Sequence, residues 1–335
     1  MTVIWEDARR EYFEYLERPD VTAGSRVIEE LVSGGETVAD VVLEVLRPSQ
    51  VEVGRRWQVN EWTVADEHAA SAVTETALMS VGASLAARRH RGSLVLACAP
   101  GEWHTLPLRM VSEVLAEAGY DCHFLGPSIP AEHLRSFLER VRPMALALSC
   151  SSPLSLEGAC ESIAAAHASA IPVVVGGRGF GPDAHRAGVA GADAWCDDLL
   201  TAVDTLEAWR SGSVSTFATA STVPAEVGGD EDLITVRRTV VAALTARFPR
   251  LADYTAQQWA RTREDIDSIL QFAHVAVRFR DERIFTDFAI WLSEVLMARH
   301  VPAVVFNASL VAVADALSAT QPLNSALVRR SASRT

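Results

Sequence analysis

Glu102 and His104 are the pair of side chains whose spacing points most directly to chemistry. They lie between an apolar run that ends at Ala99 and a helix-like run that starts at Leu106. A carboxylate close to a histidine can hold one imidazole nitrogen and strengthen the other nitrogen as a metal ligand. The same spacing also occurs in ordinary solvated loops. The secondary-structure elements around it must therefore distinguish a metal ligand from a solvated histidine. We predict that His104 binds a metal and that Glu102 is its hydrogen-bonding partner.

Strand-like and helix-like runs alternate from this point on, and they position the pair. Strands are predicted over 94–99, 122–125, 145–149, 173–175 and 194–196, with helices over 106–118, 131–140, 155–168, 182–187 and 199–209. The alternation predicts an α/β domain with a parallel, doubly wound sheet of the flavodoxin-like (Rossmann-type) class. His104 then lies at the carboxyl end of a strand, where such sheets bind ligands.

Two other segments fall at the same edge of the predicted sheet. Ser149 and Ser151 follow the third strand, and Gly176 and Gly177 follow the fourth. Serine hydroxyls can hydrogen-bond a ligand, and paired glycines let a backbone approach one closely. An ordinary strand-to-helix turn would explain the glycines as well.

Helix-like runs flank the α/β stretch on both sides. Before it, helices are predicted over 2–17, 23–31, 37–45 and 63–88, with Pro48 interrupting or restarting the third and 51–60 as a separate helix. After it, they are predicted over 233–247, 253–277, 283–299 and 301–317. We therefore expect a multidomain α and α/β protein: a four-helix-bundle cap over 1–91, the α/β domain over 92–211, a linker over 212–232, an all-α domain over 233–320 and a frayed tail over 321–335.

Composition narrows the possible functions. The net charge of -13 argues against nonspecific binding to nucleic acid or to an anionic membrane. All 30 basic residues are arginine, which excludes a lysine Schiff base and a P-loop lysine. The five cysteines stand singly, without zinc spacing. No signal-like N-terminus and no apolar run of membrane-spanning length is present, so we expect a cytoplasmic protein.

The order of these motifs resembles the cobalamin-binding domain shared by methionine synthase, mutases and corrinoid proteins. It is E-x-H after strand one, Ser-x-Ser after strand three and Gly-Gly after strand four. In that family the loop histidine replaces dimethylbenzimidazole as the lower cobalt ligand, and the displaced nucleotide tail enters a slot beside the first strand. The resemblance implies that His104 is the lower ligand to cobalt. It also implies cobalamin contacts from Glu102, Trp103, Thr105, Leu106, Ser149, Ser151, Gly176 and Gly177.

Two positions depart from the usual cobalamin-domain pattern. Glu102 stands where an aspartate is usual, a variant associated with the photoreceptor branch of the family. Pro107 stands where a glycine usually follows the histidine by three residues, and proline has no N–H and a fixed φ. The loop around His104 is therefore expected to have a shape of its own, although proline is well tolerated where a helix starts.

Trp57, followed ten residues later by Glu67-His68, resembles the signature of cobalamin-dependent photoreceptors. The resemblance implies that Trp57 covers the 5′-deoxyadenosyl group of adenosylcobalamin, that Val64 packs on the same upper face, and that Glu67 and His68 hold the group's polar atoms. Gln58 stands where some members place a histidine that captures cobalt after photolysis, so His68 or water is expected to take that role. From the residues alone, a bundle-core tryptophan and a solvated first helical turn remain the simpler alternative.

The C-terminal helices resemble the globin-like, non-haem sensor domains of bacterial stress regulators. A cobalamin photoreceptor joined to such a domain resembles the photocobilins, whose extra domain binds biliverdin. No cysteine follows Cys196, so a bilin here is expected to be noncovalent. Arg278, Arg280 and Arg283 are candidates for its propionates and His274 for its pyrrole nitrogens, with solvated arginines on a helix face as the alternative.

The resemblance implies a light sensor and not an enzyme, in which photolysis of the cobalt–carbon bond changes quaternary structure. We expect a homo-oligomer with light-dependent assembly, a separate output protein, no membrane or nucleic-acid partner, and no DNA-binding head before the bundle. A corrinoid methyl carrier in a methyltransferase system is the alternative, and a Trp57 cap argues against it. A radical mutase is not favoured, because the sequence shows no barrel-like substrate domain. A haem sensor is not favoured either, because it would leave the E-x-H loop without a role.

Overall fold

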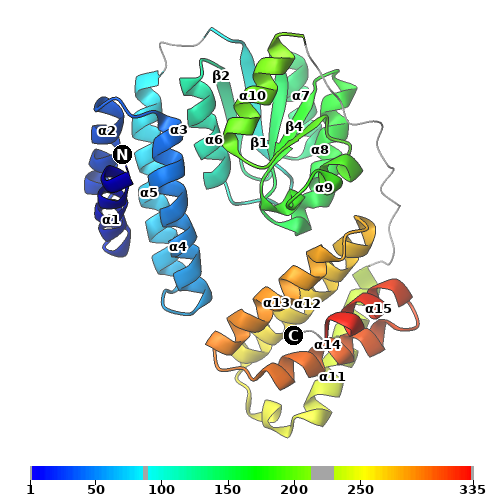
Figure 1. Ribbon diagram of the computed structural model, residues 1–335. Helices are drawn as coiled ribbons and strands as arrows, with labels where there is room; N and C mark the ends of the chain where they lie inside the picture. Colours follow the sequence, from blue (N-terminus) through cyan, green and yellow to red (C-terminus); the bar gives the residue numbers. More distant parts are fainter. Residues whose placement is uncertain (1, 86–89, 213–229, 333–335) are drawn as a thin grey trace. The chain divides into compact units, whose positions relative to one another are not determined.

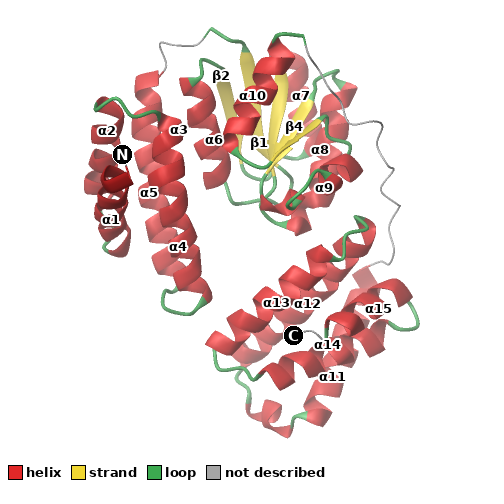
Figure 2. Cartoon of the chain, viewed as in Figure 1, coloured by secondary structure: helices red, strands yellow, loops and turns green. Residues whose placement is uncertain are grey.

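The computed structural model describes residues 2–85, 90–212 and 230–332 (Figure 1). The chain divides into two compact units, Met1–Ser221 and Thr222–Thr335. The first unit holds a helical bundle followed by an α/β sheet, and the second holds helices in its described residues (Figure 2). This order confirms the predicted fold class, apart from the globin-like character of the second unit, which stays a prediction. The predicted linker lies almost wholly in residues 213–229, outside the described residues.

Four helical rods form the bundle within residues 2–85. They are α1 (Thr2–Glu17), α2 (Val21–Ser33), a continuous rod of α3 (Val38–Val41), η1 (Val42–Leu46) and α4 (Arg47–Gln58), and α5 (Val64–Leu85). Tyr12, Leu16, Ile28, Leu46 and Leu78 are among its buried side chains. The rods begin at residues that cap them: the Asp20 side chain accepts from Ala23 N at 2.9 Å, and Thr37 accepts from Asp40 N at 3.0 Å.

Pro48 does not interrupt the third rod, contrary to the prediction. The five residues before α4, Val42–Leu46, form a π-helical turn, in which Arg47 N bonds to Val42 O. A proline inside a regular α-helix lacks a donor and crowds the carbonyl four residues earlier. The wider π turn accommodates both effects, so the rod runs on through Pro48 to Gln58. Sequence periodicity did not reveal this turn.

The sheet has five parallel strands in the order β2-β1-β3-β4-β5. They are β1 (Ser93–Cys98), β2 (Asp121–Gly126), β3 (Ala145–Ser149), β4 (Val173–Gly176) and β5 (Ala194–Cys196). The helices between and after them are α6 (Leu106–Glu117), α7 (Ala131–Val141), α8 (Leu156–Ala168), α9 (His185–Ala190) and α10 (Leu199–Arg210), with short η3 (Pro153–Ser155) and η4 (Arg178–Phe180). The parallel sheet is flavodoxin-like, as predicted, and its strand order places the switch between β1 and β3.

The strand order runs in opposite directions from this switch, which places helices on both faces of the sheet (Figure 1). Leu115 of α6 and Leu206 of α10 share one buried cluster with Leu94 and Leu96 of β1. The predicted helix over 182–187 is shifted, because α9 begins at His185, after a turn in which Asp183 Oδ1 accepts from His185 N at 3.1 Å.

Helix α6 joins the sheet to the bundle. Its Met110 and Val114 belong to the same buried cluster as the bundle core. Glu113 lies so close to Gly82 of α5 that a side chain there would overlap the carboxylate. Glu117 Oε1 accepts from Val38 N at 2.8 Å at the start of α3, where the helix dipole favours a negative charge.

The second unit consists of α11 (Asp230–Arg247), η5 (Pro249–Asp253), α12 (Ala256–Arg278), α13 (Arg283–Ala298), α14 (Ala303–Leu317) and α15 (Pro322–Ser331). The last of these corrects the expectation of a frayed tail. Leu327 and Val328 are buried, and Ser325 Oγ donates to Ala314 O at 2.7 Å. The Ser- and Arg-rich composition suggested a loose end, whereas the spacing of its few apolar residues matches one face of a helix.

Candidate functional site

The carboxylate of Glu102 connects the two loops beside the switch point. Its Oε1 accepts from the His104 backbone N–H at 2.8 Å and from His104 Nδ1 at 2.6 Å. Its Oε2 accepts from the backbone N–H groups of Ser151 at 2.6 Å and Ser152 at 2.8 Å. Glu102 is only 1% exposed. A single buried carboxylate therefore fixes the loop after β1, the loop after β3 and the orientation of the imidazole.

The electrostatics of the pair follow from these hydrogen bonds. Burial by itself would raise the pKa of Glu102, but the bonds from His104 and Ser152 outweigh it and hold the pKa below its usual value. The hydrogen bond to Glu102 raises the pKa of His104 against the opposing effect of burial. Glu67 of the bundle adds a smaller electrostatic contribution that also raises the pKa of His104. The field of the bundle thus reaches the imidazole of the loop.

His104 has the donor set that a single-histidine metal ligand requires. The side chain is 71% exposed, in contrast to its buried partner. Because Nδ1 is bonded to Glu102, Nε2 is the nitrogen left for a metal. Among the described residues, no three His, Cys, Asp or Glu side chains gather as a metal site. The residues fit one bond from the protein to a metal whose other ligands come from elsewhere, as a corrin would supply them.

The predicted serines and glycines of the sheet edge lie where the sequence placed them. Ser149 is buried at the end of β3 and stands opposite Cys98 of β1 and Gly176 of β4. Gly177 has a φ of 101°, and a Cβ there would lie 2.5 Å from Cys150 O. Its close approach is therefore to its own chain, as in the turn considered as the alternative. Ser152, which donates to Glu102 alongside Ser151, was missed because a backbone donor has no sequence signal.

The remaining loop residues differ in their exposure. Trp103 is 72% exposed, whereas Thr105 and Leu106 are half-buried. Leu106 packs against the core that the bundle shares with α6. Pro107 lies in the first turn of α6, where its missing N–H costs no helical hydrogen bond.

The bundle brings the second predicted group to the ends of α4 and α5. Trp57 is half-buried beside Gln58 in the last turn of α4, and Val64 starts α5 with an exposed side chain. Glu67 Oε2 lies 2.6 Å from His68 Nδ1, and Glu67 Oε1 accepts from Ser71 Oγ at 3.0 Å. In the described bundle, Trp5 is in the core and Trp62 packs against it, whereas Trp57 is outside this cluster. This placement does not favour a core role for Trp57.

Comparisons with known proteins agree with this geometry. Residues 8–80 and residues 92–204 each match a family model described as a B12 binding domain. The chain carries B12-binding domains. The match over 92–204 includes the Glu102–His104 loop and all five strands of the sheet, and the match over 8–80 includes Trp57 and the Glu67–His68 pair.

A curated relative of these B12-binding domains is the HTH-type transcriptional repressor CarH of Myxococcus xanthus. It is 34% identical over 137 residues, which cover 40% of this chain and 46% of the relative. The match thus spans less than half of the relative's length. A monomethylamine corrinoid protein from Methanosarcina barkeri has a similar structure, with a TM-score of 0.53 and 16% identity, over 60% of this chain and 98% of that one. This likeness shows the shared fold of bundle and sheet.

The candidate bilin residues lie on α12, in the turn that follows it and at the first residue of α13. His274 and Arg278 are half-buried and one helical turn apart, so they share a helix face. Arg280 is exposed in the turn, with a φ of 52°. Arg283 bonds both oxygens of the buried Asp281, at 2.8 and 2.9 Å. Its guanidinium is therefore already engaged within the chain.

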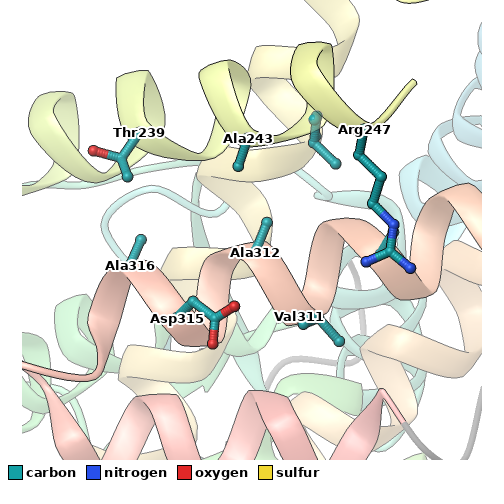
Figure 3. Close-up of a pocket in the computed structure, with 9 residues that line it drawn as sticks. Thr239, Ala243, Arg247, Val311, Ala312, Asp315 and Ala316 are labelled. Atoms are coloured by element: carbon teal, nitrogen blue, oxygen red, sulfur yellow. The ribbon is translucent and has the colours of Figure 1, made fainter. Parts of the chain in front are cut away.

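A shallow groove of about 280 Å³ lies elsewhere in the second unit, between α11 and α14 (Figure 3). Small side chains form most of its walls, and Arg247 and Asp315 are its charged members. None of the four candidate bilin residues lines this groove. A ligand in the groove would therefore not contact them. No described helix is both long enough and apolar enough to cross a lipid bilayer.

Proposed function

We propose that this chain is a light sensor that binds adenosylcobalamin in its first unit, with His104 Nε2 as the lower ligand to cobalt. The observation that carries the proposal is the Glu102–His104 pair, in which a buried carboxylate orients an exposed imidazole. The matches to B12-binding domains and to the repressor CarH support it. We propose a sensor and not an enzyme.

The chain's own residues define the two sides of the proposed site. Glu102 keeps the proton of His104 on Nδ1, so that Nε2 presents its lone pair. Trp57 and Val64 supply apolar surface that excludes water from the upper side. Glu67 and His68 offer a carboxylate and an imidazole to the polar atoms of the adenosyl group. When bound, adenosylcobalamin supplies a cobalt–carbon bond that visible light breaks.

Signal transmission requires that the bundle contact the ligand differently in the two states, since only differential contact shifts a conformational equilibrium. Helix α5 carries Glu67 and packs on α6, which directly follows the His104 loop. The Glu117 bond to the start of α3 is a second connection between bundle and sheet. We propose that these contacts pass the change on to the assembly of a homo-oligomer and from there to a separate output protein.

The proposal also includes biliverdin as a second chromophore, bound in the second unit. It would bind noncovalently, with His274 near its pyrrole nitrogens and Arg278, Arg280 and Arg283 near its propionates. The half-buried pair on α12 supports the first two assignments, whereas Arg283 would have to exchange its bond to Asp281.

A corrinoid carrier for methyl transfer fits the fold equally well, because the similar monomethylamine corrinoid protein has the same bundle and sheet. The two functions differ in what the upper side must do. A carrier needs an open upper side that other enzymes can reach, whereas a sensor needs a covered one. Light-dependent assembly separates them.

The test is to load the full chain with adenosylcobalamin and biliverdin in darkness. Absorption spectra and size-exclusion profiles are then recorded before and after green light. The sensor predicts a lasting spectral change together with a changed elution volume. Both are lost in His104→Ala and weakened in Trp57→Ala. A red band that stays with the protein through gel filtration would support the bilin, and unchanged assembly on illumination would favour the carrier.

A further inference from the structure

A chain of hydrogen bonds inside the bundle ends at Glu67. The buried hydroxyl of Tyr12 donates to Thr74 Oγ1 at 2.8 Å, and Gln50 Nε2 lies 2.7 Å from the same oxygen. Gln50 Oε1 lies 3.3 Å from Ser71 Oγ, which in turn lies 3.0 Å from Glu67 Oε1. Tyr12 and Thr74 are fully buried. The chain thus links the bundle core to the half-buried Glu67 and the exposed His68 through a single amide.

Ser71 has one hydroxyl proton and two acceptors within reach. The ionised carboxylate of Glu67 is the stronger acceptor and the nearer one, so the proton goes to Glu67. The Ser71 oxygen can then only accept a hydrogen bond from Gln50, so the NH2 group of Gln50 must face it. This requires a 180° rotation of the Gln50 amide, which exchanges its oxygen and nitrogen. Thr74 donates to the amide oxygen in that orientation. Every donor from Tyr12 to Ser71 then points toward Glu67.

The π turn in the third rod determines which side of α4 carries Gln50. Its extra residue rotates the following helix by about 100° relative to an uninterrupted α-helix. Gln50 is directed at α5 in this register, as its bonds to Ser71 and Thr74 show. Trp57 is seven residues further along and so falls on the same face of α4.

We propose that Gln50 and Ser71 are positioning residues for the upper ligand, which hold the Glu67 carboxylate, and through it His68, toward the adenosyl group. This inference rests on the proposed function and specifies which part of the bundle recognises the upper ligand. It predicts that breaking the hydrogen-bond chain weakens the binding of adenosylcobalamin and leaves the binding of a cobalamin with a small upper ligand unchanged.

The test measures binding of adenosylcobalamin and of hydroxocobalamin to the full chain in darkness. Gln50→Leu and Ser71→Ala each remove one partner of the Gln50–Ser71 hydrogen bond and so break the hydrogen-bond chain at the same place. Ser80→Ala is the matched control, because Ser80 is a half-buried serine of α5 whose hydroxyl donates within its own helix, to Ala77 O. Ser71→Thr is the conservative variant, which keeps a hydroxyl at this position. The His68 Nδ1 proton is followed by NMR in the cobalamin-free chain as a readout that needs no cofactor.

The expected result is a loss of about tenfold in adenosylcobalamin affinity for Gln50→Leu and Ser71→Ala, which is about 1.4 kcal/mol. Hydroxocobalamin affinity stays within about twofold, Ser71→Thr recovers binding and Ser80→Ala changes neither. In the cobalamin-free chain, the His68 proton exchanges more slowly in the unaltered chain than in the two breaking variants. Equal losses for both cobalamins, or no loss, would overturn the inference. If the unaltered chain bound neither cobalamin, the proposed function would fail, while the His68 proton would still decide whether the hydrogen-bond chain orders this pair.

Discussion

Glu102 holds His104 at two points, through the backbone N–H and through Nδ1, with the same carboxylate oxygen. The other oxygen is bonded to the start of the β3 loop. The imidazole therefore cannot turn without breaking its bond to a carboxylate that two neighbouring loops hold in place. The carboxylate acts both as an orienting group and as a connection across the switch point of the sheet.

Replacing Glu102 by glutamine separates these roles. An amide has one acceptor, so its NH2 group must face either the serine N–H donors or His104. In the second case Nδ1 becomes an acceptor and the proton moves to Nε2, which can no longer bind a metal. We expect Glu102→Gln to lower the free energy of unfolding by about 2 kcal/mol and to abolish cobalamin binding through His104. Urea unfolding and absorption spectroscopy measure the two effects.

Glu102→Asp is the matched variant, because it keeps the charge and both acceptor oxygens. We expect it to retain part of the binding, with a smaller loss in stability. A Glu102→Gln protein as stable as the unaltered chain, and equally able to bind cobalamin through His104, would contradict the role of the carboxylate.

The second unit contains a carboxyl group whose ionisation opposes folding. Burial raises the pKa of Asp265 to about 6, from an ordinary value of 3.8, with a further contribution from Glu264. The folded state binds more protons than the unfolded state between these values, so the free energy of unfolding falls as the pH rises from about 4 to about 6. Asp265→Asn removes this dependence. We expect it to stabilise the unit by about 1–2 kcal/mol at pH 7.5, allowing for solvent screening of a partly exposed group.

Scanning calorimetry at pH 4.5 and pH 7.5 tests this expectation. The difference between the variant and the unaltered chain should be large at the higher pH and small at the lower one. Asp267→Asn is the control on the same helix, since it removes an ion pair with Arg237 and should give no gain in stability. A gain from Asp265→Asn that did not depend on pH would contradict the explanation.

The final helix can be tested through two leucines with opposite surroundings. Leu327 is 2% exposed and Leu323 is 69% exposed. We expect Leu327→Ala to destabilise the second unit by about 2–5 kcal/mol, because it leaves a cavity under α15. Leu323→Ala should change stability by less than about 0.5 kcal/mol. Equal effects in thermal unfolding would mean that the tail does not pack.

Much of the α/β domain could be predicted from the sequence, because each strand is a short apolar run between turn residues. No strand end differs from its predicted position by more than one residue, and the observed strand order places Glu102 and His104 beside the switch point. The connection between Glu102 and Ser152 could not be predicted, since a backbone donor carries no residue signature. The hydrogen-bond chain through Gln50 was also missed, because it depends on a π turn that changes the phase of the helix around Pro48.

Electron paramagnetic resonance of bound cob(II)alamin tests the central claim most directly. The chain is prepared twice, once with natural nitrogen and once with histidine uniformly labelled with nitrogen-15. If His104 Nε2 is the lower ligand, each cobalt line is split into a triplet in the first sample and into a doublet in the second, and the change is absent in His104→Ala. Triplets in both samples would show that the axial nitrogen belongs to the cofactor and would contradict the account.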